Sequence, residues 1–155
     1  LGQDQVSELG ELARAAELAI SAATYDGDTP APIRLAIRTA GQVVVTNPDM
    51  LHSAILPHHT KWFQLFEQLR IIVIDELHTY RGVFGSHVAN VIRRLLRLCR
   101  HYGSNPVMVC ASATIGNPSE LAAHISLGPE PAIERTSTMS PPCTYPCVNA
   151  FVRIV

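Results

Sequence analysis

The sequence predicts an α/β fold of three layers, in which helices cover both faces of a parallel β-sheet. Strand-like apolar runs alternate with helix-like segments along the chain, and this alternation is typical of right-handed crossover units. The run Ile71 to Ile74 contains no polar residue, as expected of a strand that is buried on both faces of a parallel sheet. A chain of 155 residues is long enough for one domain with a sizeable core.

The first half of the chain predicts two strands and three helices. Apolar residues three or four positions apart predict a helix close to the start. Asn47 and Pro48 predict a helix start, because Asn can cap the first turn and Pro lacks an amide that would have no partner there. The expected strands are residues 21–25 and 42–46, the later helices are 32–39 and 51–56, and Gly41 ends the first of these two.

The second half predicts two more strands, three more helices and a tail of different character. One helix has an apolar face formed by Trp62, Phe63, Phe66 and Leu69. The strand 71–74, a long helix from about residue 86 to Gly103, the strand 106–111 and a helix that begins at 117–120 follow in order. We expect one domain over residues 1–128 and a poorly ordered, proline-rich tail over 129–155, in which only 151–155 resembles a strand.

Composition and charge are those of an ordinary globular protein. The net charge of −1 gives no overall basic field that would attract nucleic acid. A local basic cluster fits either a solvated helix face or a docking surface, and it consists of Arg93, Arg94, Arg97 and Arg100. No apolar stretch reaches the roughly 20 residues that span a bilayer, and no signal peptide is recognisable. We expect no membrane partner and a cytoplasmic, nucleoid-associated or nuclear location.

Cysteine and histidine spacing gives little support for a metal site of protein ligands. Cys99 and Cys110 lie in apolar surroundings and are expected to be buried thiols, so a disulfide framework is not expected. The tail pair Cys143 and Cys147 could form half of a zinc site, but no second pair lies nearby. The adjacent residues 58 and 59 are both histidines without matching ligands, which favours surface or packing roles.

Two adjacent carboxylates, Asp75 and Glu76, stand where the apolar strand 71–74 ends. In parallel sheets covered by helices, ligands gather at the carboxyl ends of the strands. Asp75 there could hold Mg²⁺ together with phosphate oxygens and waters, and Glu76 could orient and deprotonate a water for in-line attack on a γ-phosphate. His78 could sense the phosphate or bridge to a neighbouring loop. The same acidic pair is also compatible with a simple turn cap.

Two further groups of polar residues follow predicted strands. Ser112 and Thr114 follow the strand 106–111, and their hydroxyl groups could reach the acidic pair if the two strands are neighbours; a structural turn explains them as well. Thr46, Asn47, Pro48 and Asp49 follow the strand 42–46 at a helix start, where free amides and a hydroxyl could bind the phosphate backbone of a nucleic acid. A plain helix cap explains those four residues equally well.

Together, IIVIDELH over residues 71–78 and SAT over 112–114 resemble motifs II and III of the DEAD/DEAH-box superfamily of ATP-dependent helicases. Their order and separation are similar too. Four longer strings resemble the MrfA-like, Hrq-type branch of DNA repair helicases, and these are TYDGDTP (24–30), VVTNPDMLH (44–52), DELHTYRGVFGSHVANVIRRL (75–95) and SATIGNP (112–118). The resemblance covers roughly residues 1–128.

The resemblance implies the first RecA-like domain of the P-loop NTPase class, incomplete at its N-terminus. It implies that Asp75 and Glu76 are the Walker B acids, that residues 46–49 are motif Ib on the DNA strand, and that residues 1–5 end motif Ia. It further implies that Ser112 and Thr114 couple ATP hydrolysis to strand movement. The expected cofactors are ATP and Mg²⁺. The expected partners are a DNA single strand or single/double-strand junction and a second RecA-like domain, and the expected activity is 3′-to-5′ unwinding in DNA repair.

The sequence departs from the family pattern in three respects. It contains no phosphate-cradling Gly-rich loop with its Lys and Ser/Thr, and it contains no second RecA-like domain with an arginine finger. Residues 136–155 do not resemble the strands that usually follow in the family. We therefore expect a partial motor domain that does not hydrolyse ATP alone. The alternatives are a non-catalytic module that binds single-stranded DNA or a protein, and a different hydrolase that uses the acid pair alone.

Overall fold

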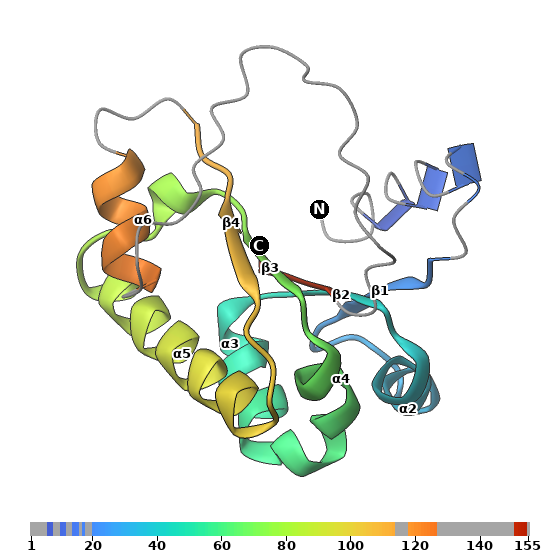
Figure 1. The fold of residues 1–155 in the computed structure, drawn as a ribbon. Coiled ribbons are helices and arrows are strands. Elements are labelled where there is room, and N and C mark those ends of the chain that lie inside the picture. Colours follow the sequence, from blue (N-terminus) through green and yellow to red (C-terminus); the bar gives the residue numbers. More distant parts are fainter. Residues whose placement is uncertain are drawn as a thin grey trace.

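The computed structural model describes residues 6–7, 10–11, 14–15, 17, 20–113, 118–126 and 151–154. In this part of the chain five strands form one sheet in the order β1-β2-β5-β3-β4, and all neighbouring strands are parallel (Figure 1). The strands are β1 (Ala22–Tyr25), β2 (Val43–Thr46), β3 (Ile71–Ile74), β4 (Val107–Cys110) and β5 (Phe151–Ile154). The predicted parallel α/β class is confirmed.

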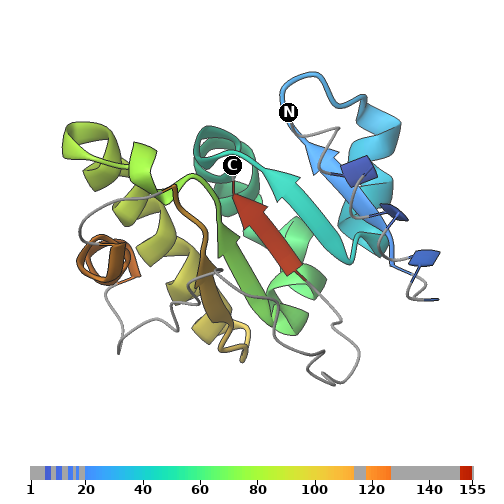
Figure 2. The same ribbon diagram turned by 90° about the horizontal axis from the view of Figure 1, so that it is seen from above.

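Among the described residues, helices cover one face of this sheet and pack against one another, whereas side chains of the edge strand β4 are exposed on the other face, so the predicted layers of helices on both faces are seen on one face only. The helix α2 (Ala31–Ala40) contacts α4 (Phe63–Gln68), and α4 contacts α5 (Gly82–His101); Figure 2 shows these helices behind the sheet. A further helix, α6 (Pro118–Ser126), lies beside α5. Within the described residues no helix is both long enough and apolar enough to cross a membrane.

The strand β4 is only partly buried, although its sequence is an apolar run. Val107 is 58% exposed and Val109 is 38% exposed, whereas Met108 between them is buried. Because β4 is an edge strand and its side chains alternate between the two faces of the sheet, only one set of them reaches the covered face. The apolar run alone did not reveal this position.

The strand β5 confirms the strand-like character predicted for residues 151–155 of the tail, and its four residues belong to the sheet. Phe151–Ile154 lies between β2 and β3, with Val152 opposite both Val44 and Ile72. Val152 is 2% exposed and Ile154 is fully buried, so two alternating apolar side chains fill the centre of the core. Residues 129–150 and 155 of the expected tail lie outside the described residues.

The segment after β2 forms a nearly continuous helical run rather than two separate helices. The Asn47 side chain accepts a hydrogen bond from the Met50 amide at 2.8 Å, so the predicted cap is present. The run consists of α3 (Pro48–Met50), the π-helix η1 (Leu51–Ile55), the 3₁₀-helix η2 (Leu56–Trp62) and α4. Trp62 and Phe66 of the predicted apolar face are buried, but Phe63 is 47% exposed.

The long helix α5 begins at Gly82, earlier than the predicted start near residue 86. Its apolar side is buried through Val88, Val91, Ile92, Leu95 and Cys99. The helix ends at His101, shortly before Gly103, whose φ of +86° favours glycine. Cys99 on this helix is buried and Cys110 at the end of β4 is half-buried, and both thiols are free. The core around them includes Val44, Leu51, Ile55, Phe66, Ile72, Ile74, Ile92, Leu95 and Val152.

Candidate functional site

The acid-bearing loop and the Ser-Ala loop lie side by side at the carboxyl edge of the sheet. Ile74 and Cys110 are paired at the ends of β3 and β4. Beyond this pair, the Ala111 amide donates to the Ile74 carbonyl at 2.8 Å, and the Leu77 amide donates to the Ala111 carbonyl at 2.9 Å. The predicted neighbourhood of the two strands is therefore present, and backbone hydrogen bonds continue the pairing into the two loops.

Asp75 is anchored to the sheet by its backbone. Its amide donates to the Ile154 carbonyl at 2.9 Å, and its Oδ1 accepts a hydrogen bond from the Glu76 amide at 2.9 Å. The residue is half-buried. A carboxylate in this position is partly screened from water and keeps a surface that a cation could reach, in accord with the predicted role in metal binding.

Glu76 adopts a left-handed backbone conformation, with φ of 49° and ψ of 39°. This region is unfavourable for residues other than glycine, and such strain concentrates at functional sites. The Thr79 hydroxyl and amide both donate to the Glu76 carbonyl at 2.8 Å, which fixes the turn. The side chain is 56% exposed, so the carboxylate faces solvent rather than the core.

His78 connects the two loops through a single ring nitrogen. Its Nδ1 accepts a hydrogen bond from the Ala113 amide at 3.3 Å and lies 3.3 Å from Glu76 Oε2. A ring nitrogen accepts a hydrogen bond only when unprotonated and donates one only when protonated. His78 can therefore bond to the Ala113 amide or to the Glu76 carboxylate, but not to both at once.

Ser112 and Thr114 were predicted to couple ATP hydrolysis to strand movement, and the structure describes only the first of them. Ser112 is exposed, and its hydroxyl donates to the Ala113 carbonyl at 2.9 Å, which stabilises the loop that His78 contacts. Thr114 lies outside the described residues. The structure thus brings together four of the five predicted catalytic residues at one edge of the sheet: Asp75, Glu76, His78 and Ser112.

Tyr80 is a site residue that the sequence reasoning missed. Its side chain is 3% exposed, and burial together with the charges of Asp75 and Glu76 raises the pKa of Tyr80 to about 12. Gly85 packs so closely on the Tyr80 carbonyl that a Cβ atom there would collide with it. The signal in the sequence was the short separation of Tyr80 from the acids within one loop.

Residues 46–49 were predicted to bind a nucleic-acid backbone. The side chains of Thr46 and Asn47 make hydrogen bonds within the fold. The Thr46 hydroxyl is buried and donates to the Tyr25 carbonyl at 2.8 Å, so in this structure it supports the fold, and its contact with a phosphate stays a prediction. The Asn47 side chain caps the following helix, Pro48 is buried, and Asp49 is exposed. Pro48 has no amide, and the Met50 and Leu51 amides donate to Asn47. What this helix start can still offer an anion is therefore the backbone amide of Asp49.

No cluster of three or more His, Cys, Asp or Glu side chains that could hold a metal occurs among the described residues. His59 Nδ1 lies 2.7 Å from the Tyr102 hydroxyl, and His58 Nδ1 lies 3.1 Å from the Ala54 carbonyl. Both histidines thus have packing contacts of the kind that was predicted. Cys143 and Cys147 lie outside the described residues.

A parallel sheet with two acids at the end of one strand and a hydroxyl-bearing loop at the end of its neighbour defines the class of α/β nucleotide-binding domains. Comparisons with known proteins narrow this class. The family model described as DEAD/DEAH box helicase matches residues 1–121. The chain belongs to the DEAD/DEAH box helicase family.

Individual relatives agree with this assignment. The ATP-dependent helicase YprA of Bacillus subtilis is 66% identical over 126 residues, which cover 81% of this chain and 17% of that protein. The ATP-dependent helicase HRQ1 of Saccharomyces cerevisiae is 50% identical over 97 residues, which cover 61% of this chain and 9% of that protein. The crystal structure of the DUF1998 helicase MrfA bound to DNA and AMPPNP is similar with a TM-score of 0.80 and 62% identity over 86% of this chain and 18% of MrfA.

Proposed function

We propose that this chain contributes the acid-bearing part of an ATP-dependent DNA helicase motor, in which ATP hydrolysis drives 3′-to-5′ movement along DNA and unwinding in DNA repair. The observation that carries the proposal is the contact between His78 and Ala113, which links the acid-bearing loop to the neighbouring strand end. The named helicases among the relatives and the DNA and AMPPNP bound in MrfA support it. The chain spans 17% of the length of the Bacillus relative, so the whole motor comprises more than these residues.

The donor chemistry at the sheet edge fits a magnesium-nucleotide. Mg²⁺ prefers oxygen ligands and keeps several of its waters, so one partly exposed carboxylate is a suitable protein ligand. Asp75 would hold the ion, and the ion would neutralise charge on the phosphates of ATP. Glu76, with its solvent-facing carboxylate, would orient the attacking water and accept its proton at an Oε atom.

DNA would contact the loop of residues 46–49 at the same edge of the sheet. The first-turn amides of a helix lack partners within the helix and favour anions. Because the Thr46 hydroxyl and the Asn47 side chain are engaged internally, we expect the backbone of this loop, rather than those side chains, to contact a phosphate. A single strand or a single/double-strand junction is the expected ligand, with a cytoplasmic, nucleoid-associated or nuclear location.

The isolated 155-residue chain is not expected to hydrolyse ATP, since it has no Gly-rich phosphate loop. A second RecA-like domain would supply the remaining groups. A chimera tests the proposal: the matching segment of the Bacillus subtilis relative is replaced by the aligned residues of this chain. We expect DNA-stimulated ATP hydrolysis that Glu76→Gln reduces by about 10²- to 10⁴-fold.

The matched control for this chimera is Glu67→Gln, which removes the same charge from an exposed position on α4. Unchanged hydrolysis by the Glu76→Gln chimera would remove Glu76 from the chemistry and favour a non-catalytic binding module. Binding of the 155-residue chain to labelled single-stranded DNA at two salt concentrations supplies the second readout. Phosphate contacts must weaken as salt rises, and a signal that does not depend on salt would contradict the DNA-binding part of the proposal.

A further inference from the structure

We propose that α5 carries a second nucleic-acid contact, a stripe of arginines that binds the phosphate backbone of duplex DNA. The arginine stripe is defined as Arg93, Arg97 and Arg100. Its ligand rests on the proposed function, because DNA is the substrate proposed for the motor. The contact is separate from the loop of residues 46–49, which we assign to the single strand.

The segment of the chain that contains α5 carries positive charges and no negative ones. The protein has a net charge of −1, yet no Asp or Glu occurs between Leu77 and Ser119. Five of its 12 basic residues fall between positions 81 and 100, and all five are arginines. Arginine presents a planar fork that matches phosphate with two hydrogen bonds, whereas lysine is a point charge. A basic segment of this composition is typical of a phosphate-binding surface.

The three arginines of the stripe lie on one side of α5. Positions four and three apart share a helix face, and all three residues are exposed. The opposite side of α5 is buried through Val88, Ile92, Leu95 and Cys99, which holds the helix against the sheet. The stripe is thus presented to solvent by a rigid and well-packed helix.

The length of the stripe allows contact with more than one phosphate. A helix rises about 1.5 Å per residue, so Arg93 and Arg100 are separated by about 10 Å along the axis. One strand of B-DNA carries a phosphate about every 3.4 Å along its axis and also winds around that axis, so neighbouring phosphates lie farther apart than this rise and the stripe reaches about two or three of them. A regular duplex offers such a row without bending, which favours duplex DNA over an acidic protein segment of irregular spacing.

The stripe also has side chains available for a ligand. Within the described residues, the side chains of Arg97 and Arg100 have no hydrogen bond or ion pair, and Arg93 donates only to the neutral Asn90 side chain at 2.9 Å. Arg94 lies on a different side and bonds to His52 Nδ1 at 2.6 Å. Like charges at these spacings repel one another unless an anion neutralises them.

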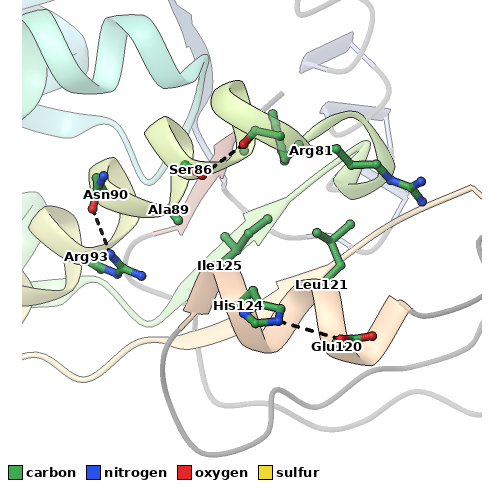
Figure 3. A pocket seen from close by; sticks show the side chains of 12 residues that line it. Arg81, Ser86, Ala89, Asn90, Arg93, Glu120, Leu121, His124 and Ile125 are labelled. Carbon is green, nitrogen blue, oxygen red and sulfur yellow. Dashed lines mark hydrogen bonds and ion pairs between the residues drawn. The ribbon is translucent and has the colours of Figure 1, made fainter.

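A pocket at the N-terminal end of the stripe extends the polar surface. It has a volume of about 500 Å³ and lies between α5 and α6, with Ser86, Asn90 and Arg93 along the α5 wall (Figure 3). Arg81 lies at its other end. Glu120 on the α6 wall, 4.0 Å from His124, carries the opposite charge. Phosphate would therefore follow α5 and avoid the α6 wall.

Duplex titrations of the 155-residue chain test the stripe. The variant Arg97→Gln/Arg100→Gln removes two of the proposed contacts, and Lys61→Gln/Arg70→Gln removes the same charge at two exposed positions outside the stripe. For labelled duplex, we expect the slope of log K against log salt to fall by about 0.9 per lost contact, or about 2 for the stripe variant. The control variant should keep the slope of the unchanged chain.

Three results would overturn the inference: an unchanged slope for the stripe variant, an equal loss in the control variant, and a loss confined to single-stranded DNA. Competition by polyglutamate as effective as that by duplex DNA would overturn it in favour of an acidic protein partner. Glu120→Gln should strengthen duplex binding, because it removes a negative charge from the pocket that Arg93 also lines. The titrations contain no ATP, so a failure of ATP hydrolysis in the chimera is distinguishable from a failure of the stripe. Equal unfolding midpoints would show that the variants remain folded.

Discussion

The imidazole of His78 accepts a hydrogen bond from the Ala113 amide at 3.3 Å, and this contact joins the loops that follow β3 and β4. The same Nδ1 lies 3.3 Å from the Glu76 carboxylate. Since one nitrogen cannot serve a donor and an acceptor at once, the two contacts define alternative arrangements of the site. An element with two arrangements is what coupling between an ATP site and a DNA site requires.

His78→Ala is expected to separate ATP hydrolysis from its stimulation by DNA. In the chimera described above, the variant should retain basal hydrolysis within about threefold, while stimulation by single-stranded DNA falls about 5-fold or more, a typical coupling magnitude. The control is His58→Ala, which removes an exposed histidine whose Nδ1 lies 3.1 Å from the Ala54 carbonyl. Equal stimulation in the two variants would show that the His78 contact does not carry coupling.

Gly85→Ala is expected to destabilise the loop that carries Tyr80. An added Cβ atom would collide with the Tyr80 carbonyl, and backbone cannot move aside as a flexible side chain can. Overpacking of this kind typically costs about 1–3 kcal/mol, which urea unfolding of the 155-residue chain would measure. Gly27→Ala is the matched control, because nothing lies within 4 Å of a Cβ atom at that position. A cost equal to that of the control would refute the close contact.

The pKa of Tyr80 makes stability depend on pH in the alkaline range. Burial and the neighbouring acids raise this pKa from 10.0 to about 12, so the folded state holds the proton more strongly than the unfolded state. The resulting stabilisation is fully present below pH 10 and is lost as pH rises toward 12. Its size is on the order of 2–3 kcal/mol. Burial also raises the pKa of Cys99 and of Cys110 to about 11, which adds to the same trend.

The comparison with Tyr80→Phe isolates the tyrosine contribution. The variant lacks the titrating hydroxyl but retains the aromatic ring, so its stability should fall less between pH 10 and pH 12 than that of the unchanged chain. Urea unfolding at several pH values within this window gives the difference directly. Parallel curves for the two proteins would show that Tyr80 does not titrate abnormally.

Thr46→Val is expected to affect stability and not DNA binding. The hydroxyl that it removes is buried and donates to the Tyr25 carbonyl at 2.8 Å, and a buried hydrogen bond of this kind contributes about 1 kcal/mol. Urea unfolding would measure the loss, and the titration with labelled single-stranded DNA would give an affinity equal to that of the unchanged chain. A marked loss of affinity in a stably folded variant would restore the hydroxyl to the DNA contact.

Local sequence patterns predicted the structure correctly where the structure depends on residues that are neighbours in the chain. The Asn47 cap, the break at Gly41 and the strand before Asp75 each depend on neighbouring residues, and all three are present. Side-chain direction was not predictable at Thr46, because a hydroxyl at a strand end can face a neighbouring strand or solvent. The left-handed turn at Glu76 and the burial of Tyr80 likewise depend on tertiary packing.

The position of β5 is the clearest case of a feature that tertiary packing decides and that local sequence does not predict. A parallel strand can pair with any neighbour that a crossover can reach, so the strand-like segment 151–155 did not reveal which strands it would join. The place of β5 between β2 and β3 can be tested through Ile154. Ile154 is fully buried, and its carbonyl accepts the hydrogen bond from the Asp75 amide. The strand therefore supports both the core and the acid-bearing loop.

Ile154→Ala is expected to destabilise the 155-residue chain by about 2–5 kcal/mol, because it leaves a cavity at the centre of the sheet. Val107→Ala truncates an apolar side chain that is 58% exposed on edge strand β4, and its cost should remain below about 1 kcal/mol. Urea unfolding of both variants measures the contrast. If the two losses were equal and small, Phe151–Ile154 would not occupy the centre of the sheet, and the support it gives to Asp75 would disappear with it.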